Sequence, residues 1–205
     1  MLPLRSTVVA RRHWVTAPLI VVNVVLFVWE FSLSPEALQA VVSTWGFTPS
    51  ALEPTTPLTS QFLHGGVMHL LGNMLFLWVF GPPIEKALGS LRYLVFYLAG
   101  GLAAAGVQWA ADPASAIPMI GASGAVSAVL GAYFALFPRT GVEVLVGFLI
   151  FWRKVKWPAL IFLGLWFVQN LLSGVIGWIT PNEGVAWWAH VGGFVMGLLV
   201  GLTRR

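Results

Sequence analysis

Long apolar stretches alternate with short polar or proline-containing segments along the whole chain. A helix needs about 20 mainly apolar residues to cross a hydrocarbon core of ~30 Å. Six stretches come close to that length, so the pattern predicts six membrane-spanning helices. They lie at 15–33, 61–81, 91–111, 117–137, 157–178 and 185–202. The predicted fold is all-α: a polytopic membrane protein in which residues 1–205 form a single membrane-embedded domain.

Two other segments are apolar in part but are not expected to span. Residues 34–60 form a long loop after the first span, and within it 37–46 can form a helix that rests on the membrane through its apolar face. Residues 142–152 are too few to cross and run into the basic stretch 153–156. We expect them to form an interfacial or packed segment that ends in a basic turn.

Composition supports this reading and removes several classes of chemistry. Hydrophobic residues make up 58% of the chain and charged residues 9%, whereas soluble domains carry about 25% charged residues. There is no cysteine, which excludes disulfides, thiolate catalysis and zinc–thiolate sites.

Positive charge is confined to one side of the predicted spans. With the N-terminus inside, the basic segment 1–14 and every other Lys or Arg fall on the cytoplasmic side. The outer loops 34–60, 112–116 and 179–184 hold acidic residues instead, and these are Glu36, Glu53, Asp112 and Glu183. The sequence therefore predicts an N-in, C-in topology. The net charge of +4 is a topology signal of this kind, so no nucleic-acid partner is expected.

The basic pair Arg11-Arg12 leaves one alternative open for the first span. Together with the apolar run 17–29 it resembles a cleaved signal peptide. No small-x-small cleavage site follows directly, so we favour a retained span.

Four polar residues lie at similar depths in three of the predicted spans. The helical rise places Ser123 ~9 Å below the outer edge, His190 ~8 Å, His69 ~10 Å and Asn73 ~16 Å. His69 and Asn73 are four residues apart and share a helix face. Gly193, Gly197 and Gly201 form a small-residue ladder that lets the sixth span approach the fourth closely. Such an approach would bring Ser123 and His190 within hydrogen-bond range.

This combination predicts acyl-transfer chemistry. Ser123 would be the nucleophile and His190 its general base, then the acid toward the leaving amine. No acidic residue was found at this depth, so the prediction is a dyad. His69, Asn73 and the Ser123 backbone N–H could stabilise the oxyanion. Taken singly, each residue also has a structural explanation as a packing serine or an interhelical hydrogen bond.

Three motifs, in order, resemble the rhomboid intramembrane serine proteases. Residues 121–124 read Gly-Ala-Ser-Gly, similar to the family's Gly-x-Ser-Gly, and 64–73 match its His-x4-His-x3-Asn. Residues 189–197 match its Ala-His-x-x-Gly-x3-Gly, and 85–92 resemble the acidic junction after its second span. The resemblance covers nearly the whole chain.

The resemblance implies a six-helix bundle that hydrolyses single-span membrane proteins near their outer boundary, with substrate reaching the site between spans two and five. It assigns Ser123 as nucleophile, His190 as base, and His69 and Asn73 to the oxyanion. The expected partners are transmembrane substrates and the lipid bilayer, with no cofactor or metal. The absence of cysteine and of further domains suits a bacterial inner membrane. One departure is Gly46 after Trp45, where the family often has Arg; this questions the anchoring of the first outer loop.

Three other functions stay open at this point. A non-proteolytic rhomboid-like binder or chaperone of membrane helices would have the same fold, although the intact Ser123 and His190 argue against it. A transporter with a histidine relay would need polar residues through the full membrane depth. A haem or metal site could use His64, His69 and His190, but His64 and His69 are expected to point to different faces of one helix. In span five, Gln169 and Asn170 are expected to face the bundle, without an assigned role.

Overall fold

The computed structural model describes residues 2–8, 13–148, 151–179 and 184–204 and has apolar helices at all six predicted places. Within these ranges, α4, α5 and α7 are long and apolar enough to cross a membrane, while α1, α6 and α8 are shorter, at 16, 14 and 16 residues. The bounds are α1 (Thr16–Phe31), α4 (Val67–Leu88), α5 (Ser90–Ala111), α6 (Ser123–Leu136), α7 (Ala159–Ile179) and α8 (Trp187–Leu202). The chain is thus a mainly helical membrane protein.

The helices differ most from the predicted spans at the start of α4 and of α6. The second span was predicted at 61–81, but α4 begins at Val67 and continues through Pro82 and Pro83 to Leu88. The fourth was predicted at 117–137, yet α6 begins only at Ser123. The predicted helix in the first outer loop is confirmed as α2 (Pro35–Trp45). It is followed by the short helices α3 (Thr56–Thr59) and η1 (Ser60–Phe62).

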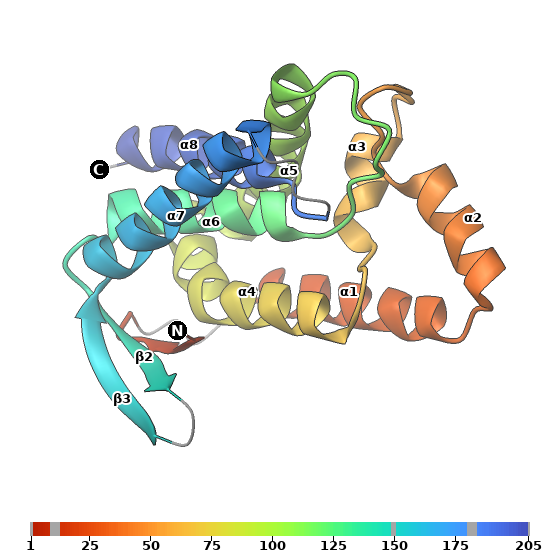
Figure 1. Ribbon diagram of the computed structural model, residues 1–205. Coiled ribbons are helices and arrows are strands. Elements are labelled where there is room, and N and C mark those ends of the chain that lie inside the picture. Colours follow the sequence, from red (N-terminus) through yellow and green to blue (C-terminus); the bar gives the residue numbers. More distant parts are fainter. Residues whose placement is uncertain (1, 9–12, 149–150, 180–183, 205) are drawn as a thin grey trace.

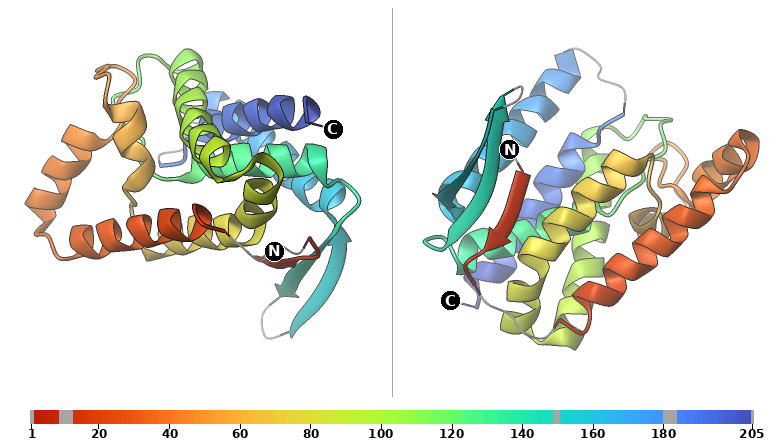
Figure 2. Two further views of the ribbon diagram at one scale, coloured as in Figure 1. Left: turned by 180° about the vertical axis from the view of Figure 1, so that it is seen from behind. Right: turned by 90° about the horizontal axis from the view of Figure 1, so that it is seen from below.

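The packing centres on α6, which lies against α8, α5 and α4 (Figure 1). Its residues from Gly124 to Tyr133 are all buried, and the facing positions on neighbouring helices are mostly glycine or alanine. Without a hydrophobic driving force between helices in lipid, such small residues permit the close backbone contact that holds membrane helices together. α1 lies beside α4 on another side of the molecule, as two further views show (Figure 2).

The prediction of an all-α fold was wrong for the chain between α6 and α7. Strands β2 (Gly141–Phe148) and β3 (Phe151–Pro158) form an antiparallel hairpin, and β1 (Leu2–Ser6) pairs with β2 to complete a three-stranded sheet. Along β2, Val142 and Val144 are fully buried, and Glu143 between them pairs in register with Arg5 and Lys156. This alternation of buried and less buried side chains has the period of a half-buried strand. The basic segment 153–156, which was expected to form a turn, is part of β3.

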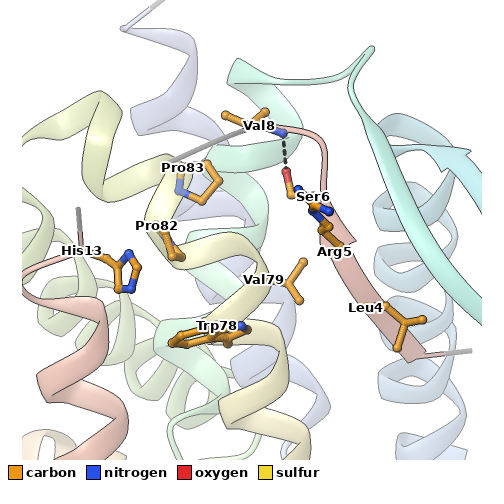
Figure 3. A pocket seen from close by; sticks show the side chains of 9 residues that line it. All are labelled: Leu4, Arg5, Ser6, Val8, His13, Trp78, Val79, Pro82 and Pro83. Atoms are coloured by element: carbon orange, nitrogen blue, oxygen red, sulfur yellow. Dashed lines mark hydrogen bonds between the residues drawn. The ribbon is translucent and has the colours of Figure 1, made fainter. Parts of the chain in front are cut away.

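A hydrogen-bonded serine ties the sheet to the helices. The Ser6 hydroxyl lies 2.6 Å from that of Tyr133 on α6, which in turn lies 2.9 Å from Thr140 Oγ1. The Val8 N–H donates to Ser6 Oγ, as Figure 3 shows. A cavity of about 160 Å³ lies beside it, between β1 and the C-terminal half of α4. Its lining contains none of the four predicted site residues.

The start of α1 is held by a buried carboxylate from α4. Glu85 is 2% exposed, and its two oxygens accept hydrogen bonds from the N–H groups of Val15 and Thr16 at 2.9 Å. They also accept from the hydroxyls of Thr16 and Ser90 at 2.7 Å. A negative charge at a helix N-terminus satisfies free N–H groups and interacts favourably with the helix dipole. Glu85 thus joins α1, α4 and α5 at one point.

Replacing Glu85 with alanine is expected to lower the free energy of unfolding by about 2–4 kcal/mol, because buried N–H and O–H donors lose a charged acceptor. Thermal unfolding in detergent measures the effect. Glu53→Ala is the matched control, since Glu53 is exposed in the loop between α1 and α4. Equal stability of the two variants would show that the Glu85 hydrogen bonds contribute nothing net.

Several sequence predictions fall outside the residues that the structure describes. They concern the basic residues Arg11, Arg12 and Arg205 and the acidic Glu183, which served as topology or signal-peptide markers.

Candidate active site

Ser123 is the first residue of α6, at the end of an extended loop. Gly121, two residues earlier, has a φ of +124°, a left-handed conformation that L side chains rarely adopt. Its N–H donates to the carbonyl of Ser60 at 2.8 Å, which fixes the loop against η1. Because α6 starts here, the N–H groups of its first turn have no partners within the helix and point toward the loop. The helix-rise argument for the depth of Ser123 therefore does not apply, since 117–122 are not helical.

The loop between α1 and α4 is anchored to the same segment despite the departure at Gly46. Phe47 and Met119 exchange two backbone hydrogen bonds, of 3.0 and 2.8 Å. A side chain at Gly46 would meet Pro118 and Ile120 at 3.1 Å and the carbonyl of Val42 closer still. Glycine thus permits close backbone contact here, where an arginine would not fit in this arrangement.

The glycine ladder of α8 packs directly on α6. A Cβ on Gly193 would collide with the carbonyl of Gly124, and one on Gly197 with that of Ala128. Moving along α8 from Gly193 to Gly197 moves the contact along α6 from Gly124 to Ala128. The two helices therefore run parallel, with Gly193 opposite Gly124. Ser123 and His190 consequently lie in the first turns of two helices in backbone contact. The close approach of these helices, predicted from the glycine ladder, is confirmed, while the hydrogen bond between Ser123 and His190 stays a prediction.

His190 is held by residues from two other helices. Its Nδ1 lies 2.7 Å from Asn170 Oδ1 on α7, and the ring packs near Trp166 and Trp187 with centroids 6.0 Å away. On α5, Gln108 Oε1 accepts from the N–H of Ala189 at 3.2 Å.

The prediction that span-five amides face the bundle is correct for Asn170, which is 3% exposed, and wrong for Gln169, which is exposed.

His69 and Asn73 approach the loop before Ser123 from α4. A Cβ built on Gly121 would lie 2.7 Å from His69 Cε1 and Nε2 and 3.6 Å from Asn73 Nδ2. Asn73 is buried, and its Nδ2 donates to no group that the structure describes. His69 is exposed. Two of the four predicted site residues, His69 and Asn73, thus lie beside the loop that leads into Ser123.

Sequence reasoning missed a carboxylate beside this cluster. Glu30, 3% exposed at the end of α1, accepts from the His64 N–H at 3.0 Å through Oε2, while no described residue pairs with its Oε1. His64 precedes α4, and its ring lies 5.3 Å from that of His69, so the expectation that the two face apart was wrong. The sequence did offer a signal for Glu30, since it is an acidic residue within the apolar run 15–33. Ionisable side chains are energetically unfavourable in membrane spans and by default indicate a functional site.

Metal binding was one of the open alternatives for these histidines. In the described parts of the chain, no three His, Asp or Glu side chains gather into a group that could hold a metal ion. Fold and site together define a helical integral membrane protein in which Ser123 begins α6, His190 lies in the first turn of the adjacent α8, and two α4 side chains lie beside the loop before Ser123.

Comparison with known proteins gives the family. Residues 52–205 match the family model described as the Rhomboid domain, and the chain belongs to this family. It is 35% identical to RHOMBOID-like protein 4 of Arabidopsis thaliana over 146 residues, covering 71% of this chain and 33% of that protein. It is 27% identical to Rhomboid-related protein 2 of Mus musculus over 221 residues, covering 98% and 68%.

A bacterial relative carries an activity in its name. The chain is 42% identical to Rhomboid protease GluP of Bacillus subtilis over 84 residues, covering 40% of this chain and 16% of that protein. The chain spans between about a sixth and two thirds of the length of these three relatives. The family includes intramembrane serine proteases, and its members here come from bacteria, plants, animals and, for Rhomboid protein 1, yeast mitochondria.

Proposed function

We propose that this protein is an intramembrane serine endopeptidase that cleaves single-span membrane proteins near their outer membrane boundary. The observation that carries the proposal is the placement of Ser123 and His190 in the first turns of two helices packed backbone to backbone. Nothing in helix packing alone requires a hydroxyl and an imidazole at these two positions. We further propose an N-in, C-in topology in a bacterial inner membrane, which makes the starts of α4, α6 and α8 outward-facing.

The reaction would follow the serine acyl-transfer route. His190 takes the proton of Ser123 Oγ as that oxygen attacks the scissile carbonyl, forming a tetrahedral intermediate. The imidazolium then gives this proton to the leaving amine, and the C–N bond breaks to leave an ester on Ser123. Water, deprotonated by His190, attacks the ester in the same way and releases the new carboxyl group.

The oxyanion needs donors that are already in place. Asn73 Nδ2 is buried without a partner among the described groups, and His69 lies beside it. The free N–H groups at the start of α6 add the positive end of a helix dipole. An unpaired buried donor is unfavourable in the resting protein, and a developing oxyanion would give it a charged acceptor.

The test is cleavage of single-span reporters by the purified protein in liposomes, with mass spectrometry to locate the cut. Cleavage near the outer boundary, together with labelling of Ser123 by a fluorophosphonate, is the expected result. Stable binding of intact reporters, without cleavage or labelling, would overturn the proposal in favour of a membrane-helix binder.

Asn73→Ala is expected to lower kcat by about 100- to 1,000-fold, the usual effect of removing one oxyanion donor, while KM changes only a few-fold. Gly72→Ala is a suitable control on the same helix, because an added Cβ there meets no atom within 4 Å. Steady-state kinetics on a reporter separates the two constants. A raised KM with unchanged kcat would instead assign Asn73 to substrate binding.

A further inference from the structure

Asn170 contacts the candidate base from a helix other than the serine's. It lies on α7, 20 residues from His190 in sequence, and its Oδ1 is 2.7 Å from His190 Nδ1. We propose that Asn170 is a positioning residue that holds His190 in the one tautomer and orientation able to deprotonate Ser123. The inference rests on the proposed function, and it turns the predicted dyad into a Ser–His–Asn arrangement.

The orientation of the Asn170 amide follows from its second hydrogen bond. Its Nδ2 donates to the backbone carbonyl of Trp166 at 2.7 Å. A carbonyl can only accept, so reversing the amide would set two acceptors against each other. The oxygen of Asn170 therefore faces His190, and because that oxygen is also only an acceptor, the proton of the neutral imidazole must lie on Nδ1.

This tautomer leaves the lone pair on the other ring nitrogen. With its proton on Nδ1, His190 offers Nε2 as the base, on the side of the ring away from Asn170. When Nε2 takes the serine proton, the Nδ1–H bond to Asn170 persists in the imidazolium, and the amide oxygen takes no proton. A neutral asparagine serves the same purpose in the Cys-His-Asn arrangement of papain-like proteases.

Neighbouring aromatic side chains and burial limit the orientations that Asn170 and His190 can adopt. Asn170 is 3% exposed, and Trp166 contributes both the carbonyl that orients the amide and an indole near the imidazole. Trp187 packs edge-on against the same imidazole, with an interplanar angle of 88°. No carboxylate that the structure describes bonds to His190, so Asn170 is the group placed to select the tautomer.

Asn170→Leu removes the acceptor at similar volume and is expected to lower kcat by about 10- to 100-fold, with KM within about threefold, as for other partners that orient a functional imidazole. Asn170→Asp restores an acceptor and adds a charge that favours the imidazolium. It should recover much of kcat and move the acidic limb of the pH–rate profile to higher pH. Gln169→Leu is the matched control, since Gln169 is the exposed neighbour on the same helix. A purely structural role would lower all activity without moving the profile.

Nitrogen-15 NMR of His190 in the wild-type protein provides a readout that needs no turnover. The proposal requires a protonated Nδ1 and an unprotonated Nε2 at neutral pH. The reverse pattern, or wild-type kcat and pH profile in Asn170→Leu, would overturn it. If the wild type cleaves no reporter, the proposed function fails, and the NMR result alone then decides whether Asn170 orients His190.

Discussion

Ser123→Ala is expected to reduce reporter cleavage on the order of 10⁶-fold, to the limit of detection, and His190→Ala should do about the same. Each variant removes one partner of a single proton-transfer unit, so the double variant should be no worse than either single one. Folding should be little affected, because the closest α6–α8 approaches are backbone contacts at glycines, which neither substitution changes.

The matched control for the serine is Ser127→Ala. The Ser127 hydroxyl lies one turn further along α6 and donates to the Ser123 carbonyl at 2.6 Å. Its loss should change cleavage only a few-fold. End-point assays at high enzyme concentration give the necessary range. Retained cleavage in Ser123→Ala would move the nucleophile elsewhere and remove the basis of the proposed mechanism.

Gly197→Ala is expected to cost about 1–3 kcal/mol of stability and most of the activity, although it adds a single methyl group. The new Cβ would collide with the carbonyl of Ala128, so α6 and α8 must separate. Both helices carry a candidate catalytic residue in the first turn, and an error of about 1 Å there can cost 100-fold in rate. Thermal unfolding in detergent should show a fall in Tm of about 3–10 °C.

Gly106→Ala on α5 provides the control for this substitution. A Cβ at Gly106 meets no atom within 4 Å, so the same chemical change should leave Tm and cleavage nearly unaffected. Equal behaviour of the two variants would mean that the α6–α8 contact tolerates a wider spacing than the structure indicates.

Sequence reasoning succeeded where one physical rule governs a long segment. Apolar runs of about 20 residues predicted the places of α1, α4, α5, α6, α7 and α8, and small-residue spacing predicted the α6–α8 contact. The predicted helix bounds were wrong where the backbone conformation depends on contacts with distant parts of the chain, as at the starts of α4 and α6. The loop before Ser123 is not helical: Gly121 takes a positive φ and its N–H donates to the Ser60 carbonyl, which hydropathy alone does not reveal.

The sheet and Asn170 show two other limits. Short apolar runs are ambiguous between helix and strand, and the alternation of Val142, Glu143 and Val144 was the available sign of β2. Asn170 lies on a different helix from His190, with no fixed spacing between them, so only the three-dimensional arrangement connects the pair. Glu30 differs, because its charge within an apolar run was visible from the start.

The pairing of β1 with β2 bears on how the protein reaches its native state. Leu2 pairs with Leu145, so β1 cannot pair with β2 during synthesis until about 140 further residues have been added. Contacts so distant in sequence close late, because the entropy of the intervening loop must be overcome first. Ordering of α1 to α6 shortens that loop before the strands meet. Closure of the sheet would then mark completion of the helical core, and its hydrogen-exchange protection should appear last during refolding.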